Sequence, residues 1–289
     1  MTAEPRICDY EGSPYRKAFW EDADRAFEDL AERRALAHLL PARGHRLVEI
    51  GAGFGRLSDL YTSYEAVYLL DYARSMLADA RQRLGDRATY VCADLYRLPF
   101  ASSTFDAVVQ VRVLHHVEDV AAAFLEVARV LCTGGSYVLE FANKRNAKAL
   151  ARWALGRQDE NPLDETPWEF VPLNWNFHPR HVERALAGAG LAVRERRAVS
   201  VLRHAALKAN VPAQRLALLD EAIGALAARV APGPSQMVRA ARLVGGPRQA
   251  IVWRCPACGH EPLIAAMDHV PCPACGRHWP IEDGIHIFR

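Results

Sequence analysis

The chain has 289 residues, of which 51% are hydrophobic and 24% charged, and its formal net charge is +2. This is the composition of a soluble globular protein, long enough for one large core and a small appendage. No apolar stretch approaches the roughly 18 residues of a membrane span, and the first residues lack the basic and apolar segments of a secretory signal. We therefore expect a cytoplasmic protein without a membrane partner, where paired cysteines bind metal more often than they form disulfides.

The charge is unevenly distributed. Residues 1–143 carry 16 Lys/Arg against 21 Asp/Glu, whereas residues 144–250 carry 17 against 9. Because no basic run in this middle segment is dense or interleaved with aromatic residues, a solvated helical surface is favoured over a nucleic-acid patch.

After a helical stretch that ends near residue 41, short apolar runs alternate with amphipathic segments. The runs that predict strands are 46–50, 66–70, 89–93, 105–114 and 135–142. The segments 74–85 and 119–131 between them predict helices. Strands that alternate with helices of this length form βαβ crossovers and a parallel sheet covered on both faces, so the fold class is α/β.

Four further elements follow along the chain. Residues 177–190 predict a helix, 191–201 a strand, 217–230 a helix, and 249–253 a last strand that runs almost directly into Cys255. This short join predicts that the C-terminal residues are not loosely tethered.

A glycine-rich turn follows the first predicted strand, in the sequence VEIGAGFGRLS. Gly51, Gly53 and Gly55 permit a tight turn and let backbone N–H groups approach a ligand. A dinucleotide-binding turn would have its third glycine at the position of Arg56. The observed spacing, preceded by Glu49, fits a different nucleotide ligand.

Acidic residues follow the next two predicted strands. Asp71 lies twenty residues after Gly51, where a carboxylate accepts hydrogen bonds from ribose hydroxyls. Asp94 and the Leu95 amide follow the third strand and can face an adenine edge, and VLHHVEDV follows the fourth. Together these motifs resemble the class I S-adenosylmethionine (SAM) dependent methyltransferases of the ubiquinone and menaquinone biosynthesis type, strongly over residues 45–145 and more weakly to residue 253.

The resemblance implies a Rossmann-like, mostly parallel, seven-stranded sheet with helices on both faces, and a SAM site at its strand ends. The residues expected at the methionine part are Glu49, Gly51, Ala52, Gly53 and Gly55; at the ribose, Asp71 and Tyr72; at the adenine, Asp94 and Leu95; and at the methyl-donor end, Gln110 and Val111. Tyr15 and Trp20 either fold over the cofactor or pack in the core.

Methyl transfer from a sulfonium needs a positioned acceptor and in some cases a base. The base candidates are His115, His116 and His178. Each has an alternative, purely structural role: His115 and His116 can shape the loop after strand four, and His178 can begin a helix before Pro179. His178 follows a Pro/Trp-rich stretch that resembles the acceptor-side lid of small-molecule methyltransferases. The Asn/Asp-Pro-Pro-aromatic motif of nucleobase and glutamine methyltransferases is absent from the end of strand four.

Two CPACG steps lie near the end of the chain. Cys255 and Cys258 are separated by thirteen residues from Cys272 and Cys275. Four thiolates with this spacing satisfy one tetrahedral zinc ion and close its coordination shell, which predicts a structural site. The sequence CPACGRHWPIEDGIHIFR also resembles the small zinc-ribbon activator subunit of several RNA and protein methyltransferases, which implies a stabilising ribbon fused in cis with no residue in the cofactor pocket.

These observations predict three regions: an N-terminal helical cap at 1–44, a methyltransferase domain at 45–253 with a lid at about 144–178, and a zinc ribbon at 254–289. The favoured function is methyl transfer to a small-molecule or lipid-like acceptor, without an obligate protein partner. RNA or protein methyl transfer is the second hypothesis, and a non-catalytic SAM-binding interaction protein is the third. The ribbon's net charge of −1 and the missing amine motif weigh against nucleic acid.

Overall fold

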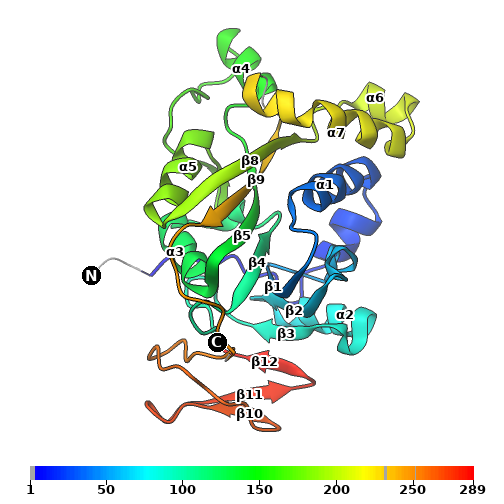
Figure 1. Ribbon diagram of the computed structural model, residues 1–289. Helices are drawn as coiled ribbons and strands as arrows, with labels where there is room; N and C mark the ends of the chain where they lie inside the picture. Colours follow the sequence, from blue (N-terminus) through cyan, green and yellow to red (C-terminus); the bar gives the residue numbers. More distant parts are fainter. Residues whose placement is uncertain (1–3, 231–232, 251) are drawn as a thin grey trace.

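The computed structural model describes residues 4–230, 233–250 and 252–289. Ten strands form one sheet in the order β10-β11-β12-β3-β2-β1-β4-β5-β9-β8, and a separate hairpin pairs β6 with β7 (Figure 1). The sheet strands that precede the cysteine steps are β1 (Gly44–Ile50), β2 (Tyr64–Asp71), β3 (Thr89–Cys92), β4 (Phe105–Gln110), β5 (Leu131–Ala142), β8 (Leu191–Val199) and β9 (Ser235–Arg242). The first five are mutually parallel, β9 runs antiparallel to β5, and β8 runs antiparallel to β9 and therefore in the direction of the first five, which confirms the seven-stranded, mostly parallel α/β fold.

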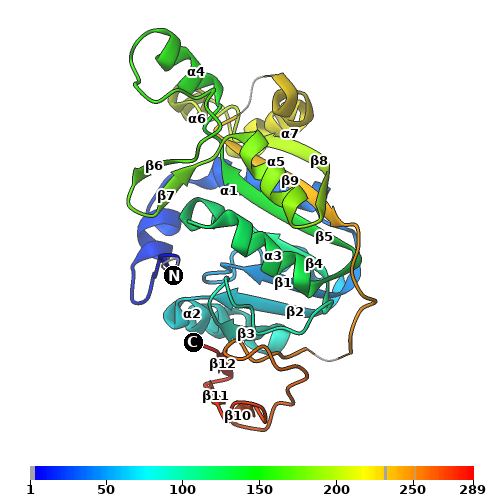
Figure 2. The same ribbon diagram turned by 90° about the vertical axis from the view of Figure 1, so that its left-hand side faces the viewer.

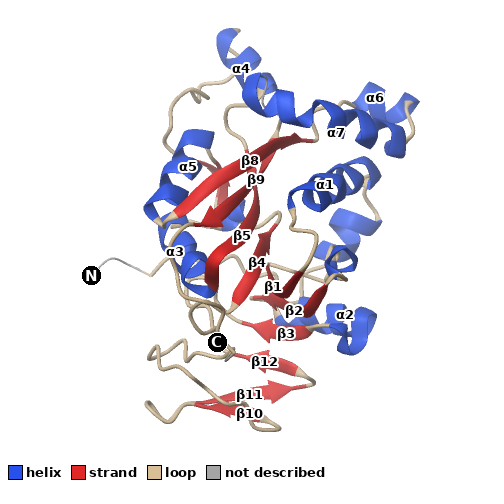
Figure 3. Ribbon diagram, in the orientation of Figure 1, coloured by secondary structure: helices blue, strands red, loops and turns tan. Residues whose placement is uncertain are grey.

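Helices cover both faces of the sheet because successive strand residues point to opposite sides. Val48 and Val108 pack with α3 (Val120–Val130) and α5 (Pro179–Gly188). Leu47 and Val109, their neighbours in the chain, pack with α1 (Ala26–Leu39) and α7 (Ala213–Val230) on the other face. A third, smaller group of buried apolar side chains joins α2 (Arg74–Leu84) to β2 and β3. Figure 3 shows the resulting three layers.

The prediction of a last strand at 249–253 is wrong. The strand at this place in the sheet is β9, at 235–242, and the described residues of 249–253 form no strand, while Ile251 lies outside the described residues. The carbonyls of Gln249 and Ala250 accept hydrogen bonds from the Arg46 guanidinium at 2.6 and 2.8 Å. Trp253 stacks on Phe100 with ring centroids 5.7 Å apart, which explains the apolar run.

The C-terminal residues extend the sheet at its β3 edge. They contain β10 (His269–Pro271), β11 (His278–Glu282) and β12 (Ile285–Ile287). β12 runs parallel to β3 and pairs Ile285 with Tyr90 and Ile287 with Cys92, so the backbone groups of this edge are paired (Figure 1). The prediction of a tight join holds, but the strand that makes it is β12. Gln249, Val252 and Arg254 add main-chain bonds to Ser103, Ala101 and Pro99 without forming a strand.

An insertion follows β5 and lies at the carboxyl ends of the parallel strands. It contains α4 (Ala147–Ala154) and the hairpin of β6 (Trp168–Val171) and β7 (Asn174–Asn176), which lie on the same side as the N-terminal segment (Figure 2). The short α6 (Ala205–Asn210) precedes α7. Among the described residues, no helix is both long and apolar enough to cross a membrane.

Candidate functional site

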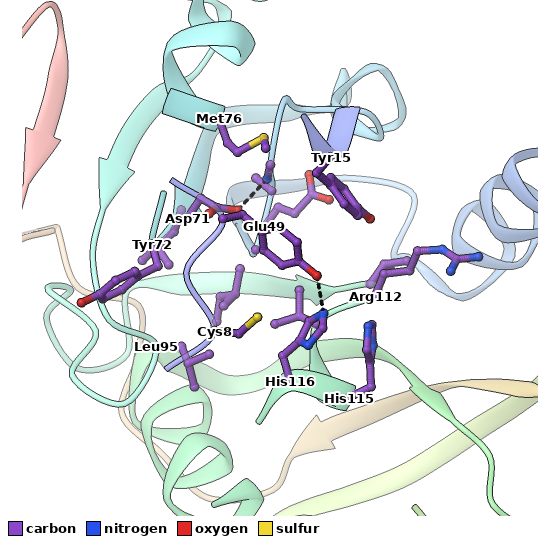
Figure 4. A pocket seen from close by; sticks show the side chains of 18 of the residues that line it. Cys8, Tyr15, Glu49, Asp71, Tyr72, Met76, Leu95, Arg112, His115 and His116 are labelled. Atoms are coloured by element: carbon purple, nitrogen blue, oxygen red, sulfur yellow. Dashed lines mark hydrogen bonds between the residues drawn. The ribbon is translucent and has the colours of Figure 1, made fainter. Parts of the chain in front are cut away.

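A cavity of about 300 Å³ opens at the carboxyl ends of β1, β2 and β4. The glycine turn, the acids that follow β2 and β3, the loop after β4, the N-terminal segment and β7 all contribute to its wall (Figure 4). The predicted residues that line it are Tyr15, Trp20, Glu49, Gly51, Ala52, Gly53, Asp71, Tyr72, Asp94, Leu95, Val111, His115 and His116. The structure therefore gathers into one cavity residues that are widely separated in the chain.

The glycine turn is fixed by the strands on either side of it. The N–H groups of Gly51 and Ala52 donate to the Leu70 carbonyl at 2.7 and 2.9 Å. Gly51 has a φ of +71°, and a Cβ there would come within 2.1 Å of a Val113 methyl carbon. Only glycine fits this position, and the bare backbone lets a ligand approach the turn closely.

Glu49 brings a buried carboxylate to the cavity. Its side chain is 3% exposed, and Oε2 has no hydrogen-bond partner. Burial raises the pKa of this group to about 8, against the opposing effect of Arg56. An unpaired buried carboxylate oxygen fits a ligand that presents an ammonium group, as the methionine part of SAM does.

Asp71 and Asp94 are held by backbone N–H groups. Asp71 accepts from Gly53 at 2.8 Å and from Ala73 at 2.9 Å, and thereby ties the glycine turn to the end of β2. Asp94 accepts from the Tyr96 N–H at 2.9 Å. Burial raises the pKa of both carboxyls. Each carboxylate oxygen has a further lone pair, so both residues keep acceptor capacity for hydroxyl or amino groups of a ligand.

The N-terminal segment forms a wall of aromatic side chains over the cavity. The Trp20 indole N–H donates to the Tyr15 hydroxyl at 3.3 Å, and the Arg56 guanidinium lies 3.9 Å from the centre of the Trp20 ring. Arg6 fastens the segment by ion pairs with Glu118 and Glu169 at 2.8 and 3.0 Å. Of the two sequence alternatives for Tyr15 and Trp20, the structure favours the one that places them at the cavity.

His116 is held at both ring nitrogens. Nδ1 lies 2.8 Å from the Leu173 carbonyl and Nε2 lies 3.0 Å from the Tyr10 hydroxyl (Figure 4). Because a carbonyl only accepts, Nδ1 carries the proton and Nε2 accepts from Tyr10. Burial lowers the pKa of His116 and lowers that of neighbouring His115 to about 3, so both imidazoles are neutral at pH 7.

Two residues that the sequence analysis missed complete the wall. Tyr10 follows no motif, and its position is set only by the fold of the N-terminal segment. Arg112 adopts a φ of +59°, which is costly for a residue with a Cβ and marks functional sites more often than others. Its guanidinium is paired with Glu32 of α1, while Nε is buried without a partner.

Three predicted residues do not reach the cavity. Gln110 is 1% exposed, and its side-chain oxygen accepts from the Tyr137 hydroxyl inside the sheet. Gly55 faces Leu84 and Leu69 instead. His178 caps α5, where Nδ1 accepts from the Arg180 N–H at 3.2 Å, which is the helix-start role left open by the sequence.

The four predicted cysteines converge at the other end of the chain. Their Sγ atoms all lie within 4.8 Å of one another. The Cys255–Cys275 and Cys258–Cys272 sulfur distances are 3.7 and 3.5 Å, close to the roughly 3.8 Å edge of a tetrahedron with Zn–S bonds of ~2.3 Å. The two knuckles share the same backbone bonds, from Gly259 to the Cys255 carbonyl and from Gly276 to the Cys272 carbonyl. This donor set fits one tetrahedral ion.

Known methyltransferases resemble this chain in sequence. A methyltransferase domain model matches residues 48–139. The chain is 32% identical over 148 residues to the phosphatidylethanolamine N-methyltransferase of Cereibacter sphaeroides, which covers 48% of this chain and 72% of that protein. It is 35% identical over 135 residues to the ubiquinone/menaquinone biosynthesis C-methyltransferase UbiE of the same species, where it spans 43% of this chain and about half (53%) of the relative.

Solved structures agree with the sequence matches. An S-adenosylmethionine dependent methyltransferase from Mesorhizobium loti has 26% identity and a TM-score of 0.55, covering 73% of this chain and 98% of that one. A chain of the complex between the Haloferax volcanii Trm112 methyltransferase activator and a methyltransferase has 18% identity and a TM-score of 0.56, covering 81% of this chain and 96% of that one, and shows the fold alone. With the strand order, the cavity at the strand ends and the sequence matches in agreement, the chain belongs to the class I SAM-dependent methyltransferases.

Proposed function

We propose that this methyltransferase acts on a small-molecule or lipid-like acceptor that enters the cavity between the N-terminal segment and the β6–β7 hairpin. The observation that carries the proposal is the shape of the site. The space beside the cofactor residues is bounded by Tyr10, Tyr15, His116 and Asn174, so an acceptor must be small or present a slender group. The names of the two relatives, one acting on phosphatidylethanolamine and one in quinone biosynthesis, support this acceptor class.

The cofactor would lie along the carboxyl ends of the strands. Glu49 would bind its ammonium group, the glycine turn would pass close to its methionine part, Asp71 would bind the ribose and Asp94 the adenine. When bound, SAM would supply a methyl group on a positively charged sulfur; the acceptor lone pair would bond to the methyl carbon in line with the carbon–sulfur bond, and the sulfur would leave as a neutral thioether. The cavity side chains would orient the acceptor and exclude water, which is the larger part of catalysis in such a transfer.

Tyr10 and His116 are suited to take a proton from the acceptor. The Tyr10 oxygen would accept that proton while its own hydroxyl proton passes to Nε2 of His116, and the Leu173 carbonyl would hold the resulting imidazolium at Nδ1. Such a base contributes roughly 10²–10⁴-fold to the rate. Tyr10→Phe is therefore expected to reduce turnover by about a hundredfold with SAM affinity little changed. Equal loss of SAM affinity would assign Tyr10 to cofactor binding instead.

The ribbon is proposed to be a structural zinc module that braces β3. Cys255, Cys258, Cys272 and Cys275 would hold one ion, and the sheet continues into the ribbon through β12. A second function, RNA or protein methyl transfer, is favoured by the resemblance of residues 272–289 to an activator ribbon and by the fold of the Haloferax volcanii chain, which was solved with its activator.

The two acceptor classes are separated by one screen. The purified protein is incubated with methyl-labelled SAM and, in parallel, with a lipid extract, a metabolite extract, total RNA and total protein. We expect label in the lipid or metabolite fraction. Label confined to RNA or protein, or tight sequence-selective RNA binding at about 150 mM salt, would replace the proposal by the second function.

A further inference from the structure

The segment 144–157 is not needed to explain the site described above. It carries Lys or Arg at five of its fourteen positions and no Asp or Glu. It contains α4, in which no residue is buried. A helix of eight residues is marginal by itself in water, and this chain covers the apolar side of α4 only in part, so a further surface against that side would stabilise it.

The composition of α4 separates into two faces. At 100° per residue, Lys148 and Arg152 fall on one side and Leu150 and Trp153 on the other. Trp153 is 37% exposed, and Leu155 directly after the helix is 67% exposed. Within the described residues, Lys144 pairs with Glu160, whereas Lys148 and Arg152 of α4 have no acidic partner.

The β6–β7 hairpin lies between this helix and the N-terminal segment, and all three are on the side of the carboxyl ends of the strands (Figure 2). Asn174 of β7 lines the cavity, while Phe170 and Val171 of β6 are 46% and 48% exposed, as is Leu163 at 48% in the connecting loop. Exposed apolar side chains therefore accompany the basic helix at the side from which an acceptor enters.

We propose that α4 and the β6–β7 hairpin dock on an anionic lipid surface, with the cavity entrance facing the lipid. A polar face of Lys and Arg beside a face with Trp and Leu is the composition of helices that lie in the membrane interface. The proposal rests on the proposed function for its purpose, since docking would bring a lipid-like acceptor to the site. It replaces the expectation, drawn from the sequence, that the protein has no membrane partner.

Charge favours lipid over a second copy of the chain as the occupant of this face. Two copies joined through α4 would bring together Lys148, Arg152 and Arg157 of each, six cations against which the nearest exposed acidic residue along the chain is Asp159. Anionic headgroups supply the opposite charge and strengthen binding about fivefold for each cation near the surface.

The test is vesicle flotation of the full chain. We expect the protein to float with vesicles of phosphatidylcholine mixed with phosphatidylglycerol and to stay in solution with phosphatidylcholine alone. The triple variant Lys148→Gln, Arg152→Gln, Arg157→Gln should lower the partition coefficient about a hundredfold, and Trp153→Ser should lower it by a smaller factor. A control variant, Arg43→Gln with Arg87→Gln, changes exposed residues that precede β1 and β3, at the amino ends of the strands, and should float like the wild type.

Thermal melting and SAM calorimetry on the same variants show that each is folded and binds cofactor. No flotation of the wild type, equal flotation with both vesicles, or unchanged flotation of the triple variant would overturn the proposal. A concentration-dependent dimer that Trp153→Ser abolishes would assign the face to a second copy and overturn it as well. Methyl transfer to detergent-dispersed lipid is measured separately, so loss of docking is distinguished from failure of the proposed function.

Discussion

Two segments are added to the seven-stranded domain, and they are attached in different ways. The ribbon, residues 254–289, joins through main-chain pairing of β12 with β3 and through ion pairs of Arg74 with Glu282 and Asp283 at 2.8 and 3.0 Å. The insertion, residues 144–178, pairs by main chain at its end, where the Phe177 N–H donates to the Ala142 carbonyl at 2.9 Å. Its hairpin is held by side chains: Nδ1 of His116 lies 2.8 Å from the Leu173 carbonyl, and Arg6 lies 3.0 Å from Glu169.

The difference matters because the two segments flank different parts of the cavity. Main-chain pairing fixes β3 and the loop after it, which carries Asp94, so the ribbon supports the cofactor side. Side-chain attachment positions the hairpin over His116 without extending the sheet, so the insertion shapes the acceptor side. We infer that changes in the ribbon act on stability and cofactor binding, and that changes in the insertion act on the acceptor.

The largest effect is expected from removal of the sulfur ligands. Cys272→Ser with Cys275→Ser should remove one equivalent of zinc, because structural zinc contributes roughly 10–16 kcal/mol to folding of zinc-finger peptides. Loss of β12 would then expose the β3 edge, and the melting temperature of the whole chain should fall by about 5 °C or more. Zinc content by elemental analysis and a thermal melt check this.

The wild type treated with a strong chelator serves as the comparison and should melt like the double variant. A double variant that kept its melting temperature but lost turnover would place the ribbon at the acceptor. In that case the division between a bracing segment and a substrate segment would be wrong.

The next effect lies on the cofactor side. Asp71→Ala should weaken SAM about ten- to a hundredfold in calorimetry, since hydrogen bonds to a charged group contribute roughly 1.5–3 kcal/mol. Asp71 also holds the Gly53 N–H at 2.8 Å. Asp71→Asn, which keeps one acceptor oxygen, is the matched control and should show a smaller loss. An unchanged dissociation constant in the alanine variant would refute the ribose role.

The cofactor side was largely predictable from the sequence. Its residues sit at fixed places relative to strands, and parallel strands bring their carboxyl ends to one edge. Glu49, Asp71 and Asp94 reach the cavity for this reason. Gln110 was misassigned because a strand-end residue points either to the cavity or into the sheet, and a one-residue difference decides which.

The acceptor side was not predictable in the same way. Tyr10 lies in a segment without regular structure, and its contact with His116 spans 106 residues of chain. The left-handed conformation of Arg112 also has no sequence signal. The false strand at 249–253 has a related cause: an apolar run reports burial, and Trp253 is buried as part of a loop rather than of a strand.

A pH effect is expected from the loop that joins the two sides. Burial lowers the pKa of His115 to about 3 in the folded protein, against about 6.5 in the unfolded chain. The unfolded state therefore binds more protons between these values, and the unfolding free energy should fall by about 1 kcal/mol per unit as pH drops from 6.5 to 5. His115→Phe should flatten this slope in urea titrations. An unchanged slope would show that His115 does not cause it.

The smallest effect should come from the contact by which the ribbon reaches the cofactor side. The Arg289 guanidinium lies 4.5 Å from the ring centre of Tyr72, a cavity residue, and its nitrogens lie 3.5 and 3.4 Å from the carboxylates of Asp9 and Glu11. Glu11 in turn accepts from the Arg74 N–H at 2.6 Å, at the start of α2. Arg289 thus holds the N-terminal segment against the end of β2.

Each of these contacts is partly exposed, so each is worth at most about 1 kcal/mol. Arg289→Ala should therefore weaken SAM binding by roughly two- to fivefold and leave zinc content and melting temperature nearly unchanged. Arg277→Ala is the matched control, because that arginine stacks on Trp279 within the ribbon and should leave SAM affinity unaltered. If both variants bound SAM like the wild type, the ribbon would support the cofactor side through β12 and β3 alone. If Arg289→Ala lowered turnover without a change in SAM affinity, the N-terminal segment would belong functionally to the acceptor side, with Tyr10, rather than to the cofactor.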